Sequence, residues 1–259
     1  MNKIYINLKE VIHDAATYLL EHGEITNTTS WQGKVDDKFS TLEVMNYSFI
    51  CPISSSIEVL EDQINPNLPW ARDHFLERVG GKPTNPGVTY MNWPFYKEER
   101  GMKEVGGEEF SHTYQERFWC PPRPGIRYAW GNLSDVIGLL MRDPMTRQAV
   151  LPVFFPEDTG AGGEIPRRVP CSLHYCFLVR DKRLNGFYAI RSCDALRHLN
   201  DDIYLAARLV LWVLDQLKLR SPEFWGEVSP GFLSTHIYSL HIFQEDLPAL
   251  KYRLEGRNK

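Results

Sequence analysis

The chain has 259 residues, 43% of them hydrophobic, so it is long enough to bury a substantial core without disulfides or metal ions. Its formal net charge is -4, which gives no general attraction to polyanions, and we therefore expect no nucleic-acid partner. We expect one domain over residues 1–259.

The cysteines are odd in number and show no CxxC spacing: Cys51, Cys120, Cys171, Cys176 and Cys193. This pattern argues against a disulfide framework or a zinc knuckle and favours a reducing compartment. Residues 1–23 have the spacing of an amphipathic helix rather than of a signal peptide. No segment approaches the roughly 20 apolar residues of a membrane span. We expect a soluble, cytoplasmic protein without a membrane partner.

Elements of both kinds are predicted in the first half of the chain. Residues 41–53 are predicted to form a strand, and residues 71–79 a helix that Gly80 and Gly81 close. The segment from residue 82 to 124 is rich in aromatic residues, Pro and Gly, and we expect long ordered loops with short helices there.

The second half alternates helices and strands irregularly. We expect a helix at 133–143, a turn at 143–146, strands at 147–155, 171–179, 186–193 and 231–243, a loop at 156–168 and a long helix at 201–219. The strands at 171–179 and 186–193 should form a hairpin, and a polar tail follows the last strand. Because no regular βαβ alternation is present, the predicted class is α+β.

Cys171 lies where the glycine-rich loop enters a strand. A nucleophilic cysteine requires a positive neighbourhood that favours the thiolate, and Arg167, Arg168 and Arg191 are candidates to supply it. The alternative interpretation is a buried core cysteine.

Arginines near strand ends suggest a phosphate site. Arg147 stands at the start of one predicted strand, and Arg191 with Ser192 at the end of another, which matches the forked donors and hydroxyl that a phosphate monoester needs. His236 and Tyr238 share one face of the last strand, where they either contact a sugar or form a half-buried aromatic face. No ligand spacing suggests a metal site.

Three segments together resemble the thymidylate synthase family: VPCSLHYCFLVRDKRLNGFYAIRSCD, DPMTRQ and THIYS. Within that family the chain is most similar to the deoxycytidylate hydroxymethylases of large DNA phages, over about Tyr128 to His241. The resemblance implies a thymidylate synthase-like three-layer fold. In it a mixed twisted sheet is packed by helices, and one sheet face forms the interface of a homodimer with shared active sites.

The resemblance also implies roles for the phosphate and nucleophile residues. Cys171 would be the nucleophile, and Arg191 with Ser192 would bind the 5′-phosphate of the nucleotide. Arg147 would reach the same phosphate from the second subunit. Gln148 stands where the family has a second arginine, so Arg167 or Arg168 would have to substitute for it.

Further roles follow from the same resemblance. Asp194 would hydrogen-bond the pterin of the folate, His236 and Tyr238 would contact the 3′-hydroxyl, and Tyr128 would help to order water. The family's catalytic glutamate sits on an early helix, for which Asp73, Glu77 and Glu116 are the candidates.

Asp202 stands eleven positions after Arg191, where thymidylate synthases have an asparagine that reads uracil and hydroxymethylases have an aspartate. A carboxylate accepts from the exocyclic amine of cytosine, so the resemblance implies dCMP as the substrate. Considered alone, either Asp201 or Asp202 fits an ordinary helix N-terminus.

The implied reaction transfers a one-carbon unit from 5,10-methylenetetrahydrofolate to C5 of dCMP through a Cys171–C6 adduct, giving 5-hydroxymethyl-dCMP. A phage-encoded enzyme of DNA modification is the corresponding context. The chain ends 18 residues after His241, without the long terminal segment typical of the synthases, which favours addition of water. The alternatives are a methyltransferase acting on dUMP or dCMP, a ribonucleotide substrate, and a non-catalytic nucleotide-binding homologue.

Overall fold

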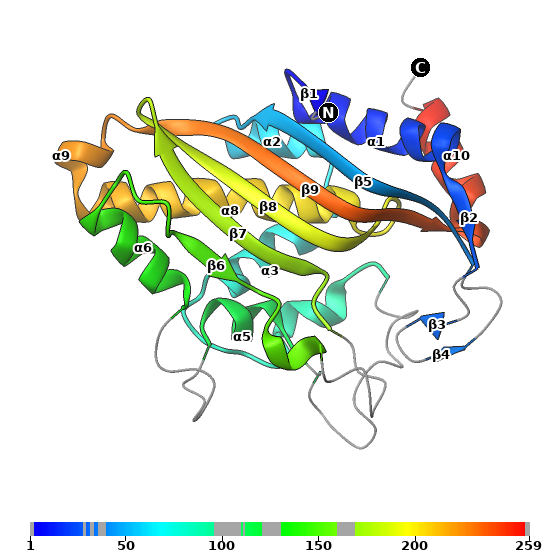
Figure 1. Ribbon diagram of the computed structural model, residues 1–259, viewed down its shortest axis with the longest axis horizontal. Helices are drawn as coiled ribbons and strands as arrows, with labels where there is room; N and C mark the ends of the chain where they lie inside the picture. The colour runs from blue at the N-terminus through cyan, green and yellow to red at the C-terminus, as the bar shows by residue number, and fades with distance from the viewer. Residues whose placement is uncertain are drawn as a thin grey trace.

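The structure is a computed structural model that describes residues 3–27, 30–31, 34–35, 40–95, 110, 112–120, 131–159 and 169–256. Over this part of the chain a mixed, twisted, open sheet packs against helices, as Figure 1 shows. The predicted α+β class is confirmed.

Seven strands of the described residues form the main sheet, in the order β1-β5-β9-β8-β7-β6, with β2 also pairing with β5. Their bounds are β1 (Lys3–Ile4), β2 (Glu24–Thr26), β5 (Thr41–Pro52), β6 (Val150–Pro152), β7 (Ser172–Arg180), β8 (Arg183–Asp194) and β9 (Ser229–Phe243). β8 and β9 run parallel, whereas β5–β9, β7–β8 and β6–β7 are antiparallel. A separate small sheet joins β3 (Ser30–Trp31) to β4 (Lys34–Val35).

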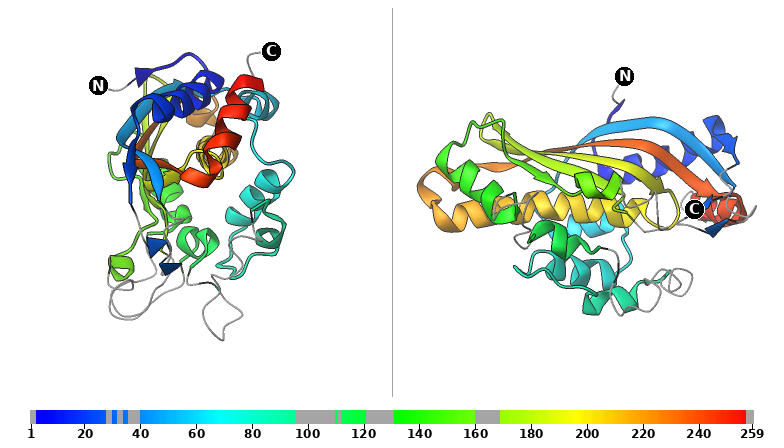
Figure 2. Two further views of the ribbon diagram at one scale, coloured as in Figure 1. Left: turned by 90° about the vertical axis from the view of Figure 1, so that its right-hand side faces the viewer. Right: turned by 60° about the horizontal axis from the view of Figure 1, so that its bottom comes forward.

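The larger helices lie on one face of this sheet (Figure 2). The helical segments are α1 (Leu8–His22), α2 (Ile57–Ile64), α3 (Trp70–Arg78), η2 (Val88–Asn92), α5 (Tyr114–Phe118), α6 (Leu133–Arg142), α8 (Leu199–Arg220), α9 (Pro222–Trp225), η4 (Gln244–Asp246) and α10 (Leu247–Gly256). α8 packs against β8 and β9 and also contacts α2, α3 and α6. It is buried along almost its whole length and forms the centre of the core.

β7 and β8 form the hairpin that the sequence predicts. Asp181 and Lys182 form a two-residue turn with φ of 50° and 54°, a left-handed pair that suits the twist of an antiparallel hairpin. This turn fixes the register from the Arg180–Arg183 pair to the His174–Ala189 pair, and a register shift between Ser172 and His174 then pairs Ser172, at the start of β7, with Ile190 near the end of β8. The residues just before β7 and at the end of β8 are therefore neighbours.

Side chains on β9 alternate between two environments. Leu233, Thr235 and Ile237 are buried toward the helices, whereas His236 and Tyr238 are exposed on the opposite face. The half-exposed ring of Phe232 and the ring of Phe187 on β8 contact each other on that opposite face, with centroids 5.6 Å apart. Among the described helices none covers this face in Figure 2, and we call it the open sheet face.

Most predicted elements are confirmed, with shifted ends. The long helix begins at Leu199, two residues earlier than expected, and the strand expected at 147–155 shortens to Val150–Pro152. The chain after β9 does not stay a polar tail but forms η4 and α10. Among the helices of the described residues, none is both long and apolar enough to span a membrane.

Candidate active site

A pocket opens where the start of α8 meets the adjoining ends of β7 and β8. Side chains from five stretches of the chain line it: Trp70, His74 and Arg78 of α3; Gly87, Tyr90 and Trp93 around η2; Phe110 and residues 112–115 at the start of α5; Cys171 and Ser192; and His198, Asp201, Asp202 and Leu205 of α8 and its cap. The pocket therefore brings together residues that are more than a hundred positions apart.

Three of the residues proposed from the sequence meet in this pocket: Cys171, Ser192 and Asp202. The hairpin register brings the first two together, because the backbone N–H of Arg191 donates to the carbonyl of Cys171 at 2.8 Å. Asp202 enters from the first turn of α8, where its Oδ2 accepts a hydrogen bond from the Cys193 thiol at 3.7 Å. A thiol, a hydroxyl and a carboxylate thus share one cavity.

Opposing effects act on the pKa of the Asp202 carboxyl. Burial raises its pKa, the charges of His198 and Arg78 lower it, and the neighbouring Asp201 raises it further, with a net upward shift. A carboxylate in this position accepts a hydrogen bond from a ligand, and a proton on it would turn it into a donor as well.

Asp201 has a different role from Asp202. Its two oxygens accept hydrogen bonds from the backbone N–H of Asn67 at 2.8 Å and from the Asn67 side-chain amide at 2.7 Å. Asp201 therefore ties the start of α8 to the loop before α3. This leaves Asp202 as the carboxylate of the pair that is available to a ligand.

Tyrosine hydroxyls surround the residue after Cys171. Ser172 Oγ lies 3.0 Å from the Tyr114 hydroxyl and 2.7 Å from the Tyr188 hydroxyl. Burial raises the pKa of Tyr114, and the charges of Cys171 and Asp202 add to the shift. The phenols of Tyr114 and Tyr188 consequently remain neutral hydrogen-bonding groups near Cys171 at physiological pH.

The early-helix candidates lie apart from the pocket lining. Asp73 is exposed on the solvent side of α3. Glu77 faces inward but is occupied, since it accepts hydrogen bonds from the Thr89 hydroxyl, the Gln115 amide and the Val88 N–H. Although burial opposes its ionisation, these donors and the nearby His74 lower the pKa of Glu77 to about 2.

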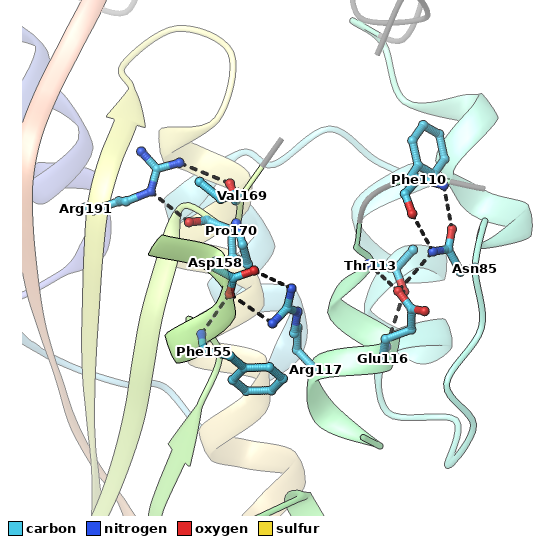
Figure 3. A network of polar contacts seen from close by, with 10 residues as sticks. All are labelled: Asn85, Phe110, Thr113, Glu116, Arg117, Phe155, Asp158, Val169, Pro170 and Arg191. Carbon is cyan, nitrogen blue, oxygen red and sulfur yellow. Dashed lines mark hydrogen bonds and ion pairs between the residues drawn. The ribbon is translucent and has the colours of Figure 1, made fainter. Parts of the chain in front are cut away.

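Glu116 serves as a helix cap. Its Oε2 accepts from the backbone N–H of Thr113 at 2.8 Å and from the Asn85 amide at 3.0 Å, which completes a capping box at the start of α5 (Figure 3). The next residue, Arg117, forms a buried bidentate ion pair with Asp158, with nitrogen–oxygen distances of 2.8 and 3.0 Å. Both contacts anchor α5 beside the pocket.

The guanidinium of Arg191 is hydrogen-bonded to backbone carbonyl groups. It donates to the carbonyls of Pro170 at 2.9 Å and Val169 at 3.0 Å and does not line the pocket (Figure 3). Arg147 and Gln148 are exposed in the segment between α6 and β6. Tyr128, Arg167 and Arg168 lie outside the described residues.

The remaining predicted contacts lie away from the pocket. His236 and Tyr238 are on the open sheet face, where His236 Nε2 lies 2.6 Å from Asn46 Oδ1 and the two rings meet edge to face. Asp194 accepts from the backbone N–H groups of Leu196 and Arg197 through Oδ1, and its buried Oδ2 has no hydrogen-bond partner among the described residues. Its contact with a pterin is not supported by this arrangement.

The aromatic segment for which the sequence suggested no role supplies one wall of the pocket. Trp93 stacks on His198 with centroids 4.8 Å apart, and Tyr90 lies 4.4 Å from Phe110. Such a wall stacks flat heteroaromatic rings. The chemistry of this wall is compatible with the pterin ring of the folate that the resemblance implies, for which Tyr90, Trp93 and Phe110 would be the aromatic contacts.

Sequence reasoning missed several pocket residues, above all His74, Arg78 and Tyr114. His74 and Arg78 are four positions apart on a helix, so they share a face, and this spacing was the available signal. All five cysteines lie among the described residues, and none forms a disulfide. In comparisons with known proteins, no family model and no curated sequence matches the chain.

Proposed function

We propose that the protein is a deoxycytidylate 5-hydroxymethyltransferase that uses Cys171 as its nucleophile. The observation that supports this proposal is the convergence of Cys171, Ser192 and Asp202 in one pocket. Their sequence spacing motivated the resemblance, and the hairpin and the start of α8 bring the same three residues together in space.

Each of these side chains has a chemical task in the proposed reaction. The Cys171 thiolate adds to C6 of the pyrimidine; its electron pair forms the S–C6 bond, and the C5=C6 π pair makes C5 nucleophilic. Asp202 accepts from the exocyclic amine of cytosine. With 5,10-methylenetetrahydrofolate bound as the one-carbon donor, C5 would take up the methylene carbon and lose its proton, and tetrahydrofolate would leave. Water would then add to that methylene carbon as the S–C6 bond breaks and Cys171 leaves as the thiolate.

The phosphate subsite requires a local rearrangement in this proposal. Ser192 already lines the pocket, whereas Arg191 must release the carbonyls of Val169 and Pro170 before its guanidinium reaches a phosphate. A bidentate arginine–phosphate contact is charge-assisted and compensates for the two lost hydrogen bonds. Binding of dCMP should therefore reorder the chain just before Cys171.

A homodimer through the open sheet face is part of the proposal. This face carries the Phe187 and Phe232 rings, and a partner subunit packed there would cover them. Arg147 is exposed on its own subunit, as a residue that acts in a partner's active site must be. Mixing a Cys171→Ser subunit with an Arg147→Ala subunit would restore one complete site per mixed dimer, or about a quarter of wild-type activity.

The proposed activity is tested by tritium release from C5-labelled dCMP and dUMP in the presence of 5,10-methylenetetrahydrofolate, with the product weighed by mass spectrometry. We expect release from dCMP and a mass gain of one CH2O. Cys171→Ala should abolish release, whereas Cys176→Ala, five residues further along in β7 and outside the pocket lining, should leave it unchanged.

Each other outcome has a distinct meaning. A mass gain of one CH2 would identify a methyltransferase, and release from dUMP alone would contradict the base assignment of Asp202. If the Cys171→Ala variant releases tritium as fast as the native protein, covalent catalysis by Cys171 is wrong.

A further inference from the structure

Arg78 is a buried cation on the wall of the pocket. Its side chain is 6% exposed, and no carboxylate among the described residues forms an ion pair with it. Its Nε donates to His74 Nε2 at 2.9 Å, and the guanidinium lies over the ring of Tyr114 at 3.9 Å from the centroid. The terminal amino groups donate no hydrogen bond to any described residue. A buried charge is stabilised by nearby anions, and the charge of Arg78 already lowers the pKa of Asp201 and Asp202 in the same pocket, so this site favours an anion.

A chain of hydrogen bonds fixes the orientation of this guanidinium. Because His74 Nε2 accepts from Arg78, the imidazole proton is on Nδ1, which lies 3.1 Å from the Thr89 hydroxyl. Thr89 in turn donates to Glu77, and the His74 ring stacks on Trp70 at 4.8 Å. Both nitrogens of His74 are thereby engaged, which makes His74 a positioning residue for Arg78.

The pocket contains two groups that become anions when they lose a proton, the thiol of Cys171 and the carboxyl of Asp202. Cys171 lines the same cavity as Arg78. The Arg78 guanidinium lies over the ring of Tyr114, and the Tyr114 hydroxyl lies 3.0 Å from the Oγ of Ser172, the residue after Cys171. Arg78 also lowers the pKa of Asp202 against the effect of burial. The positive field of Arg78 therefore extends over the region where the nucleophile and the base-reading carboxylate meet.

We propose that Arg78 stabilises the thiolate of Cys171 and then the negative charge that this thiolate passes to the pyrimidine ring. The first part stands on the pocket alone, and the second rests on the proposed function. As the S–C6 bond forms, the negative charge leaves sulfur and spreads over the ring, and a fixed guanidinium beside the ring favours that displacement. The identity of this cation was not foreseen from the sequence, which suggested Arg167, Arg168 and Arg191 for this purpose.

The first part is tested by the rate of alkylation of Cys171 with iodoacetamide, followed by peptide mass spectrometry, without nucleotide or folate. We expect Arg78→Met to slow the reaction at neutral pH about tenfold, since a nearby opposite charge shifts a pKa by about one to three units. Arg78→Lys should retain most of the rate. Arg72→Met is the matched control, because Arg72 is on the same helix but exposed and paired with Glu61.

Different outcomes separate the alternatives. An unchanged alkylation rate in a folded Arg78→Met variant overturns the proposal. So does a variant that alkylates normally but loses protection of Cys171 by inorganic phosphate, since Arg78 would then be a phosphate ligand. Because the assay needs no substrate, a protein without hydroxymethyltransferase activity still gives a result, and the two proposals fail independently.

A second measurement uses the native protein and tests whether Arg78 acts on Cys171 even if Arg78→Met does not fold. Because Arg78 and Cys171 line the same pocket, the positive charge of Arg78 should attract the anionic reagent iodoacetate, so the rate ratio of iodoacetate to iodoacetamide should exceed that of glutathione. A ratio equal to or below that of glutathione overturns the proposal.

The second part is tested with nucleotide. Arg78→Met should lower kcat about tenfold and change KM little, whereas Arg78→Lys, which keeps the positive charge, should retain most of kcat, because the charge on the ring exists only as the adduct forms. A rise in KM with unchanged kcat would restrict Arg78 to ground-state binding and overturn this part.

Discussion

Replacing Asp202 with asparagine should change which pyrimidine the pocket accepts. An ionised Asp202 offers only acceptors, which suit the exocyclic amine of cytosine but face the O4 acceptor of uracil. Leaving such a buried group unpaired costs about 1–3 kcal/mol. The amide of asparagine has both a donor for O4 and an acceptor for N3–H, so Asp202→Asn should relieve this penalty for dUMP.

The expected magnitude follows from these terms. We expect the ratio of kcat/KM for dCMP to that for dUMP to fall by about 10-fold to 100-fold in Asp202→Asn, measured by tritium release from each nucleotide. Asp201→Asn is the matched control, because it removes a charge from the adjacent residue while Asp201 is engaged by Asn67. An unchanged ratio in Asp202→Asn, or an equal change in Asp201→Asn, would refute the base-reading role of Asp202.

If Asp202 reads the base as proposed, base selection should also depend on pH. Because burial raises the pKa of Asp202, the carboxyl takes up a proton at a higher pH than an exposed aspartate does. The neutral acid gains a donor for O4, so the native protein should discriminate less against dUMP as pH falls. In Asp202→Asn the ratio should no longer follow pH, and a parallel pH dependence in both proteins would contradict this explanation.

Three further predictions concern stability and assembly. Hydrogen bonds hold the pKa of Glu77 at about 2, although burial opposes its ionisation. The stabilising contribution of Glu77 is therefore present above about pH 4.5 and is lost as the pH falls toward 2. Glu77→Gln should remove this part of the acid sensitivity of Tm. Asp158→Ala leaves Arg117 buried without its partner and should lower the free energy of unfolding in urea by about 3–5 kcal/mol. Phe232→Asp places a charge on the open sheet face beside Phe187 and should shift sedimentation toward the monomer.

Each of these predictions has an outcome that contradicts it. Acid unfolding of Glu77→Gln that matches the native curve would mean that Glu77 is not ionised to such low pH. A loss below about 1 kcal/mol for Asp158→Ala would mean that solvent reaches the ion pair. A native protein that is already monomeric would contradict the dimer before any variant is made.

Local signals predicted the parts of the fold that bring Cys171, Ser192 and Asp202 together. The alternating strands on either side of Asp181 and Lys182 determine the hairpin register, and the apolar periodicity determines the long helix that starts near Asp202. Three segments that are each recognisable from their own residues therefore give the convergence at the pocket, although their mutual placement does not follow from any one of them.

The contribution of α3 could not be predicted in the same way. Asp73 and Glu77, which the sequence favoured, share this short helix with His74 and Arg78, and only packing decides which side faces the pocket. Those contacts come from α8 and α5, far away in the chain. Sequence reasoning consequently identified the helix but not the side chains that line the pocket.

The strand that carries His236 shows a related limit. Alternation predicted that His236 and Tyr238 share one face of β9, and the structure confirms this. Which face points to the helices depends on where α8 packs, and that placement leaves both residues on the open sheet face. Similarly, Arg191 donates hydrogen bonds to the carbonyls of Val169 and Pro170, and such a local contact cannot be predicted from the residue type alone.

The central claim, covalent catalysis by Cys171 on a cytosine nucleotide, is tested most directly by trapping the adduct. The protein is incubated with 5-fluoro-dCMP and 5,10-methylenetetrahydrofolate, and its peptides are weighed by mass spectrometry. Fluorine at C5 does not leave as a proton does, so the adduct persists. The account predicts the nucleotide on the peptide that contains Cys171. An unmodified Cys171 peptide, or a nucleotide attached to another cysteine, would contradict it.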